Sequence, residues 1–259
     1  MFRGMFSIPQ GSAVQPTDLL PIPLTEDSAE EFRALCWVVY ALPNEIHLQS
    51  TRGADIPRLA NAAKMCHKYT LPVFEGWALD MIRNQCQPGS LDYLKTCPSD
   101  ILHTLMGLAL LCNHGRLLSL VETNWIFRAR SGELPCNSAL AAGEKYNRRQ
   151  FLADVYYHLN KQLYASNLSS GQAFSDLNLT DQQLLRLLSG HALLSNFWYH
   201  LRRDPLPHYP AIGCMSHHIC ILVWTATPWA STEGSDVLAG LNSARSYVAS
   251  TLSARCALQ

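Results

Sequence analysis

Apolar residues recur at intervals of three and four along most of the chain, and stop signals separate the runs. This spacing gathers apolar side chains on one face of an α-helix, whereas a half-buried strand needs strict alternation. A strong start signal stands at Asp27 and Ser28, where Glu30 or Glu31 can complete a capping box. The pattern predicts a mainly α-helical chain.

The first third of the chain is expected to hold three helices. The first helix should end before Pro43, the second should be capped by Asp55 with Pro57 just inside it, and the third should follow Leu71-Pro72. The residues expected to face inward are Phe32, Leu35, Cys36, Val39 and Tyr40 in the first helix, Leu59, Ala62, Ala63, Cys66 and Tyr69 in the second, and Val73, Phe74, Trp77, Ala78, Met81 and Ile82 in the third. If Phe74 and Trp77 are buried, they are structural residues.

One short strand is expected before these helices. Ile22 and Leu24 alternate with Pro21 and Pro23, and the prolines would confine such a strand to a sheet edge or a strand end. After the third helix, the sequence Gln87-Pro88-Gly89-Ser90 favours a domain boundary.

The remainder of the chain is expected to be helical throughout. The expected helices run from Ser99 or Asp100 to about Asn113, from about Leu117 to Arg130, from Ser138 to Tyr164 with Tyr146, Phe151, Val155 and Leu159 inward, from a Thr180 cap to Arg203, and over about 214–226 and 236–253. Residues 166–178 are expected to form a loop. The sequence has no repeat of fixed period, so nothing in it favours a solenoid.

Composition limits the classes of partner. Hydrophobic residues make up 48% of the chain and charged residues 15%, which predicts extensive burial. The 20 Lys and Arg residues balance the 20 Asp and Glu residues, so neither nucleic acid nor a membrane surface is an expected partner. The nine cysteines are odd in number, and no two have C-x-x-C spacing. Buried, reduced cysteines favour a reducing compartment, the cytoplasm or the nucleus.

The sequence lacks the common catalytic and phosphate-binding motifs. It has no G-x-S-x-G elbow, no phosphate-binding G-x-x-x-x-G-K or G-x-G-x-x-G loop, no H-E-x-x-H and no EF-hand loop. We therefore expect a protein that is not an enzyme and needs no cofactor. The alternative is a helical enzyme without a recognisable motif.

A cluster of thiols and imidazoles near the end of the chain raises a third possibility, a zinc-binding regulatory protein. Cys214, His218 and Cys220 are its weak candidate ligands. On a helix, Cys214 and His218 share a face, but Cys220 lies about 120° away from Cys214. No bound metal is therefore expected, and a buried Cys/His helix packing near Trp224 and Trp229 is the favoured interpretation.

Five segments, taken in order, resemble the BTB/POZ domain. They are Phe2-Arg3-Gly4-Met5-Phe6 followed by Ser7-Ile8-Pro9, which resembles the end of the second BTB helix; Pro21–Leu24, which resembles the third strand; Glu31–Tyr40; Leu59–Met65 with Tyr69; and Phe74–Met81, which resembles the closing helix. The chain is most similar to the large set of BTB-domain proteins from mushroom-forming fungi, which also carry a helical extension with Cys, His and Trp residues near its end.

This resemblance implies a mainly α fold with an α+β remnant. Residues 1–86 would form a partial BTB/POZ domain that lacks the first strand hairpin, 87–98 a linker, and 97–259 an all-helical C-terminal domain. The implied function is protein binding, as an adaptor for a cullin-based ubiquitin ligase, with a cullin or a BTB partner. Without the hairpin, five apolar residues would be left as interface candidates, namely Phe2, Met5, Phe6, Ile22 and Leu24.

Overall fold

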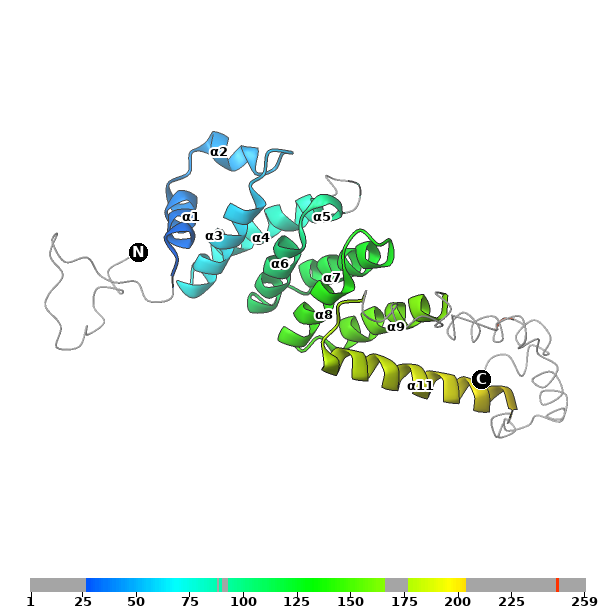
Figure 1. Cartoon of the computed structure of the whole chain (residues 1–259). Helices are drawn as coiled ribbons and strands as arrows, with labels where there is room; N and C mark the ends of the chain where they lie inside the picture. Colours follow the sequence, from blue (N-terminus) through cyan, green and yellow to red (C-terminus); the bar gives the residue numbers. More distant parts are fainter. Residues whose placement is uncertain (1–26, 88, 90–92, 166–176, 204–245, 247–259) are drawn as a thin grey trace, which may run out of the picture. The chain divides into compact units, whose positions relative to one another are not determined.

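The computed structural model describes residues 27–87, 89, 93–165, 177–203 and 246. Within these residues the regular structure is helical, with no strand, which confirms the mainly α prediction for this part of the chain (Figure 1). The chain divides into two compact units, Met1–Leu91 and Asp92–Gln259. The predicted strand at Ile22–Leu24 and the predicted helices over 214–226 and 236–253 lie outside the described residues.

The first unit contains the helices α1 (Ala29–Tyr40), α2 (Pro43–Leu48), α3 (Ile56–Lys68) and α4 (Pro72–Cys86). The start of α1 is the predicted capping box, in which Ser28 and Glu31 accept each other's backbone N–H groups. Asp55 caps α3 as predicted and accepts the N–H of Arg58. As predicted, α1 ends before Pro43. Pro43 is also the first residue of α2, a position at which a helix needs no backbone N–H donor.

The core of the first unit forms where α1 packs on α3. Its buried residues are Ala34, Leu35 and Val38 from α1 and Ala62, Met65 and Cys66 from α3. The inward prediction for α1 is confirmed at Leu35 and wrong at Tyr40, which is 76% exposed. Phe32, Cys36 and Val39 are only partly buried. The buried face of α1 runs through Ala34, Leu35 and Val38.

The prediction for α4 is also corrected in its first turn. Val73 is 79% exposed, and Phe74 and Trp77 are partly buried against the α1–α3 core. The fully buried side of α4 lies further along the helix, at Ala78, Leu79 and Ile82. Trp77 therefore packs on the core from its rim, and its truncation should cost less than the loss of a fully buried tryptophan.

The second unit contains α5 (Tyr93–Thr96), α6 (Ser99–Leu111), α7 (Gly115–Arg130), α8 (Cys136–Lys145), α9 (Arg149–Ala165) and α11 (Asp181–Arg203). The predicted limits of α6, α7 and α11 are confirmed. Thr180 caps α11, and its Oγ1 accepts the N–H of Gln183 while the Gln183 side chain accepts the N–H of Thr180. None of the described helices combines the length and apolar character that a membrane crossing requires.

The predicted single helix from Ser138 to Tyr164 is wrong, because the chain turns at Tyr146–Arg148 and separates α8 from α9. Asn147 has a φ of 51°, and the N–H of Arg148 donates to the carbonyl of Gly143 at 2.8 Å. Asparagine tolerates this left-handed conformation better than most residues do, so it ends a helix as glycine would. The inward prediction for Phe151, Val155 and Leu159 is confirmed.

The same turn closes three helical hairpins. In each hairpin, a residue with a positive φ follows the first of the two helices. The backbone N–H of the next residue then donates a hydrogen bond to the carbonyl of the residue five positions earlier. The three pairs are Leu71 to Cys66 after Thr70, His114 to Ala109 after Asn113, and Arg148 to Gly143 after Asn147, at 2.8, 2.7 and 2.8 Å. The sequence carries part of this signal as Lys-Tyr-Thr at 68–70 and Lys-Tyr-Asn at 145–147. The hairpins recur without a fixed spacing, so a search for periodic repeats does not find them.

Gly143 is expected to be required for the α8–α9 hairpin. A Cβ at this position would lie 2.7 Å from both Cγ and Cδ2 of Leu152, whereas a Cβ on Gly190 of α11 would meet nothing within 4 Å. Gly143→Ala should lower the free energy of unfolding by about 1–3 kcal/mol through overpacking. Gly190→Ala, the matched control, should leave it unchanged or raise it by up to about 1 kcal/mol. Thermal melts of both variants test this, and equal melting temperatures would contradict the close packing.

No disulfide joins any two of the six described cysteines, which are Cys36, Cys66, Cys86, Cys97, Cys112 and Cys136. Cys66 is fully buried in the α1–α3 core. Burial raises the pKa of its thiol from the ordinary value of 9.0 to about 11, and the charge of Glu75 acts in the same direction. A thiol of this kind is protonated and unreactive at neutral pH.

The raised pKa of Cys66 predicts a loss of stability at alkaline pH. Its contribution to the free energy of unfolding is fully present below about pH 9, and it falls as the pH rises toward 11, because only the unfolded chain then carries the thiolate. Urea unfolding at pH 8 and pH 10.5 should show a smaller alkaline loss for Cys66→Ala than for the parent chain. Cys36→Ala, at a partly exposed position, should lose as much unfolding free energy between the two pH values as the parent chain does. Identical losses in all three proteins would refute the assignment.

Candidate protein-binding groove

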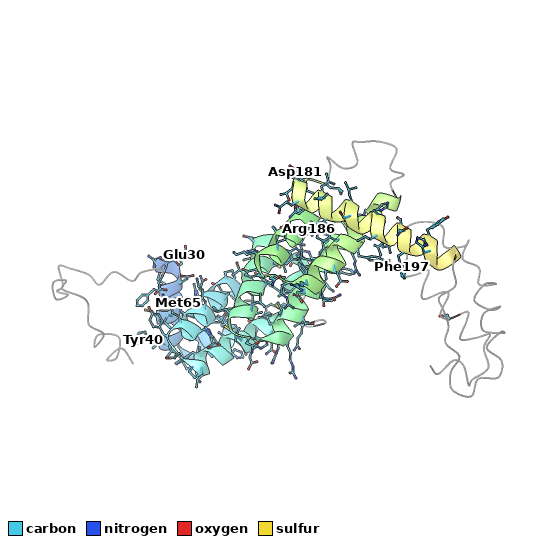
Figure 2. All side chains as sticks on the ribbon, turned by 90° about the horizontal axis from the view of Figure 1, so that it is seen from below. Glu30, Tyr40, Met65, Asp181, Arg186 and Phe197 are labelled. Carbon is cyan, nitrogen blue, oxygen red and sulfur yellow. The ribbon has the colours of Figure 1, made fainter. Side chains whose placement is uncertain are left out.

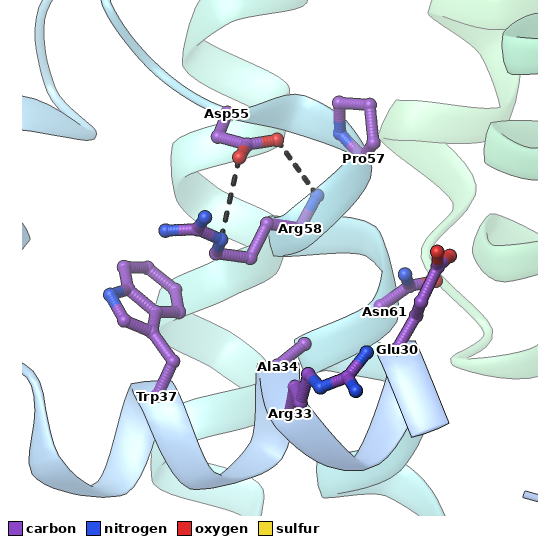
Figure 3. A pocket seen from close by; sticks show the side chains of 8 residues that line it. All are labelled: Glu30, Arg33, Ala34, Trp37, Asp55, Pro57, Arg58 and Asn61. Carbon is purple, nitrogen blue, oxygen red and sulfur yellow. Dashed lines mark hydrogen bonds and ion pairs between the residues drawn. The ribbon is translucent and has the colours of Figure 1, made fainter. Parts of the chain in front are cut away.

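A groove runs along the surface of the first unit between α1 and the start of α3 (Figure 3). It encloses about 450 Å³. Its lining residues are Glu30, Arg33, Ala34 and Trp37 from α1, Asp55 at the cap of α3, and Pro57, Arg58 and Asn61 from α3. We refer to it as the α1/α3 groove.

The polar wall of the groove is held by the loop that precedes α3. Buried Gln85 of α4 donates from its Nε2 to the carbonyls of Gln49 and Thr51, and the Gln49 side chain accepts the N–H of Asp55. These bonds fix the loop at the start of α3. Asp55 can then cap α3 through one oxygen and pair with the Nε of Arg58 through the other at 3.4 Å (Figure 3). The guanidinium of Arg58 is therefore positioned over the groove before any partner arrives.

Trp37 forms the apolar wall. The Arg58 guanidinium lies 5.3 Å from the centroid of the Trp37 ring, within the range of a cation–π contact. The ring centroid of Trp77 on α4 lies 6.2 Å from that of Trp37, with the two ring planes inclined by 46°. The Nε1 of Trp37 is buried without a hydrogen-bond partner in the described part of the chain. A rigid aromatic ring beside an arginine is the residue pair that dominates binding energy at many protein interfaces.

Two ion pairs attach the start of α1 to the last turns of α3. Asp27 accepts from the Nζ of Lys68 at 2.6 Å and from the hydroxyl of Tyr69 at 2.8 Å, and Glu31 pairs with Lys64. The hydrogen bond from Lys68 lowers the pKa of Asp27 in spite of its burial. Asp27 therefore remains charged at neutral pH and keeps the start of α1 against the end of α3.

The chemistry of the groove suits binding. Its lining contains no cysteine, histidine, serine, threonine or tyrosine, and both oxygens of Asp55 are already engaged. It therefore has no thiol or hydroxyl nucleophile and no imidazole that could act as a base. Arg33 is exposed and forms no ion pair with any residue that the structure describes. The groove thus offers a partner the guanidinium of Arg33, the amide of Asn61 and the partly exposed ring of Trp37.

The site residues predicted from the sequence stay predictions, because the structure does not describe them. The interface candidates Phe2, Met5, Phe6, Ile22 and Leu24 lie outside the described residues, and so do the weak metal candidates Cys214, His218 and Cys220. Sequence reasoning missed Trp37 and Arg58, because both fall within helices where they resemble ordinary core and surface residues. A comparison of the chain with protein-family models, curated proteins and solved structures found no match.

Proposed function

We propose that this protein is a protein-interaction module of the BTB type, and that it acts as an adaptor for a cullin-based ubiquitin ligase. The observation that carries the binding role is the α1/α3 groove, in which Trp37 and Arg58 form a preassembled pair beside exposed Arg33. The BTB type and the cullin are supported by the order of the five sequence segments that resemble that domain.

Physical considerations favour binding over catalysis at this site. A preassembled aromatic–arginine wall loses little conformational entropy when a partner docks, which is the main cost of ordering an interface. An enzyme site would require converging ionisable groups with a nucleophile or a general base within hydrogen-bond reach. The α1/α3 groove lacks this arrangement.

Affinity capture with the full-length chain tests the binding role. Arg33→Glu reverses the unengaged charge of the groove without touching the α1–α3 core. Proteins bound through the groove should be recovered at least tenfold less by this variant than by the parent. Arg116→Glu, at an exposed position of α7 in the second unit, is the matched control and should recover them undiminished. A set of partners that is retained equally by all three chains would reject the groove as the binding site.

The cullin part of the proposal has a separate test. Purified cullins are titrated against the full-length chain, and one of them should bind with a Kd in the micromolar range or tighter. If no cullin binds while the captured partners still depend on Arg33, the chain is a binding module of another pathway. If neither result is obtained, the interaction role itself is wrong.

The first unit is expected to be less stable than the second. Within the described residues, α1 buries Ala34, Leu35 and Val38, whereas α9 buries the larger side chains of Phe151, Val155 and Leu159. Hydrogen exchange of the full chain should show amides of Phe32–Tyr40 exchanging at least tenfold faster than those of Phe151–Leu159. Equal protection in a monodisperse monomer would contradict the partial-domain interpretation of residues 1–86.

A further inference from the structure

The charged side chains of the α1/α3 groove differ in how far they are already engaged. One oxygen of Asp55 accepts the backbone N–H of Arg58 at 3.1 Å, and the other lies 3.4 Å from its Nε. Among the described residues, the two terminal nitrogens of Arg58 and the whole guanidinium of Arg33 donate no hydrogen bond. The groove therefore keeps two sets of charged N–H donors for a partner, while one of its carboxylates is already paired.

These donors are not spread evenly along the groove. Helix α1 runs from its start, where Glu30 lies, to its end at Tyr40 (Figure 2). In the close view, Trp37 and Arg58 lie at one side and Glu30 at the other, with Arg33 between them (Figure 3). A carboxylate entering the groove would be repelled at the Glu30 side and attracted to the side that carries the two guanidinium groups.

An apolar surface lies in the same groove as the charged donors. It consists of the methyl group of buried Ala34, the ring of Pro57 and the partly buried ring of Trp37. The volume of about 450 Å³ lies within the range of about 300–1,000 Å³ that is typical of ligand pockets. The groove can therefore take a short segment with one bulky apolar side chain, which would pack against the aromatic ring.

We propose that the α1/α3 groove binds a short acidic segment of another protein. A carboxylate of the segment pairs with Arg33 and with the terminal nitrogens of Arg58, and a neighbouring apolar side chain packs on Trp37. Guanidinium groups suit this role because their planar fork can donate two parallel hydrogen bonds to one carboxylate. This inference names the partner chemistry of the groove and rests on the binding function proposed above.

A basic segment and a nucleic acid suit the groove less well. The engaged Asp55 leaves Glu30 as the carboxylate available to a basic segment, which would also meet the charge of Arg33. A nucleic acid presents a phosphate at every nucleotide, and proteins bind this charge with many basic side chains. The groove has two acidic and two basic lining residues, so it selects a carboxylate at one position instead of attracting a polyanion.

Fluorescence anisotropy with the full-length chain tests the partner chemistry. The probe is a fluorescein-labelled peptide of four Gly-Asp-Phe repeats, and the comparison peptides carry the same label on four Gly-Lys-Phe or four Gly-Asp-Ser repeats. The chain should bind the Gly-Asp-Phe peptide at least tenfold more tightly than either comparison peptide, because only this peptide supplies both the carboxylate and the apolar side chain.

Three variants locate this binding on the chain. Arg33→Glu should weaken binding of the Gly-Asp-Phe peptide at least tenfold, because it replaces attraction by repulsion. Glu30→Gln should strengthen it about twofold to threefold, because it removes a like charge from the other side of the groove. Arg116→Glu, at an exposed position of α7, is the matched control and should leave binding unchanged. Thermal melts verify that each variant is folded, and Arg33→Gln is the milder substitution if Arg33→Glu is not.

Several results would overturn the inference. They are no binding of the Gly-Asp-Phe peptide, equal binding of the Gly-Lys-Phe or Gly-Asp-Ser peptide, and equal weakening by Arg33→Glu and Arg116→Glu. If captured partners depend on Arg33 but the peptides are not distinguished, the proposed binding function stands and the acidic partner chemistry is wrong. If the peptides bind as expected but no captured partner depends on Arg33, the partner chemistry stands and the proposed function is wrong.

Discussion

Replacing Trp125 with alanine is expected to lower the free energy of unfolding of the second unit by about 3–5 kcal/mol. Trp125 lies on α7 and is 1% exposed, and its ring centroid is 5.8 Å from that of Phe151 on α9. It is the largest of the fully buried side chains in the described residues. Its loss would leave a cavity between α7 and α9 that neighbouring side chains can fill only in part. Urea unfolding monitored by circular dichroism measures the change.

Two controls separate the burial of Trp125 from other effects of mutation. Phe127→Ala removes an aromatic ring two residues away that is 59% exposed, and it should change stability by less than about 1 kcal/mol. Trp125→Phe should cost far less than Trp125→Ala, because the buried Nε1 of Trp125 has no hydrogen-bond partner in the described residues and its removal relieves that cost. Similar losses for Trp125→Ala and Phe127→Ala would show that α7 is not packed as described.

Replacing Arg128 with methionine is expected to cost about 2–4 kcal/mol, because it removes two charge-assisted hydrogen bonds from the interior of the second unit. Arg128 is 6% exposed, and its Nη1 donates to the carbonyls of Leu94 at 2.9 Å and Cys97 at 2.6 Å. These bonds attach the short helix α5 to α7. Methionine fills a similar volume but leaves both carbonyls without this donor.

The matched control for Arg128 is Arg130→Met on the same helix. The side chain of Arg130 is 50% exposed, and its closest contact with Asp154 is 4.0 Å, so its loss should change the free energy of unfolding by less than about 0.5 kcal/mol. Hydrogen exchange adds a local measurement, since amides of Tyr93–Thr96 should lose protection in Arg128→Met before those of α9. If both variants unfold at the same urea concentration, Arg128 does not have the anchoring role assigned to it.

The sequence predicted the helix boundaries that depend on local chemistry. The caps at Ser28, Asp55 and Thr180 were found because each combines a side-chain acceptor with a suitable residue in the first turn. The break at Asn147 was missed, because asparagine at a left-handed position resembles any polar residue of a long amphipathic helix. The close approach of Leu152 to Gly143 depends on the packing of α8 on α9, which no local pattern predicts.

The candidate site was less predictable than the fold. Trp37 and Arg58 are 21 positions apart, and only the packing of α1 on α3 brings them within 5.3 Å. Arg128 looks like a basic residue in the last turn of a helix, which is the usual place for an exposed cation. Its side chain is buried because it donates hydrogen bonds to the carbonyls of Leu94 and Cys97. No local pattern in the sequence of α7 predicts these bonds.

The most direct test of the interaction role is hydrogen exchange of the full-length chain, alone and with a partner whose capture depends on Arg33. The partner should slow exchange in Ala29–Tyr40 and in the first turns of α3, where the α1/α3 groove lies. Exchange in α6 to α9 should not change. Slower exchange confined to the second unit, or no change in either unit, would contradict the assignment of the groove as the binding surface.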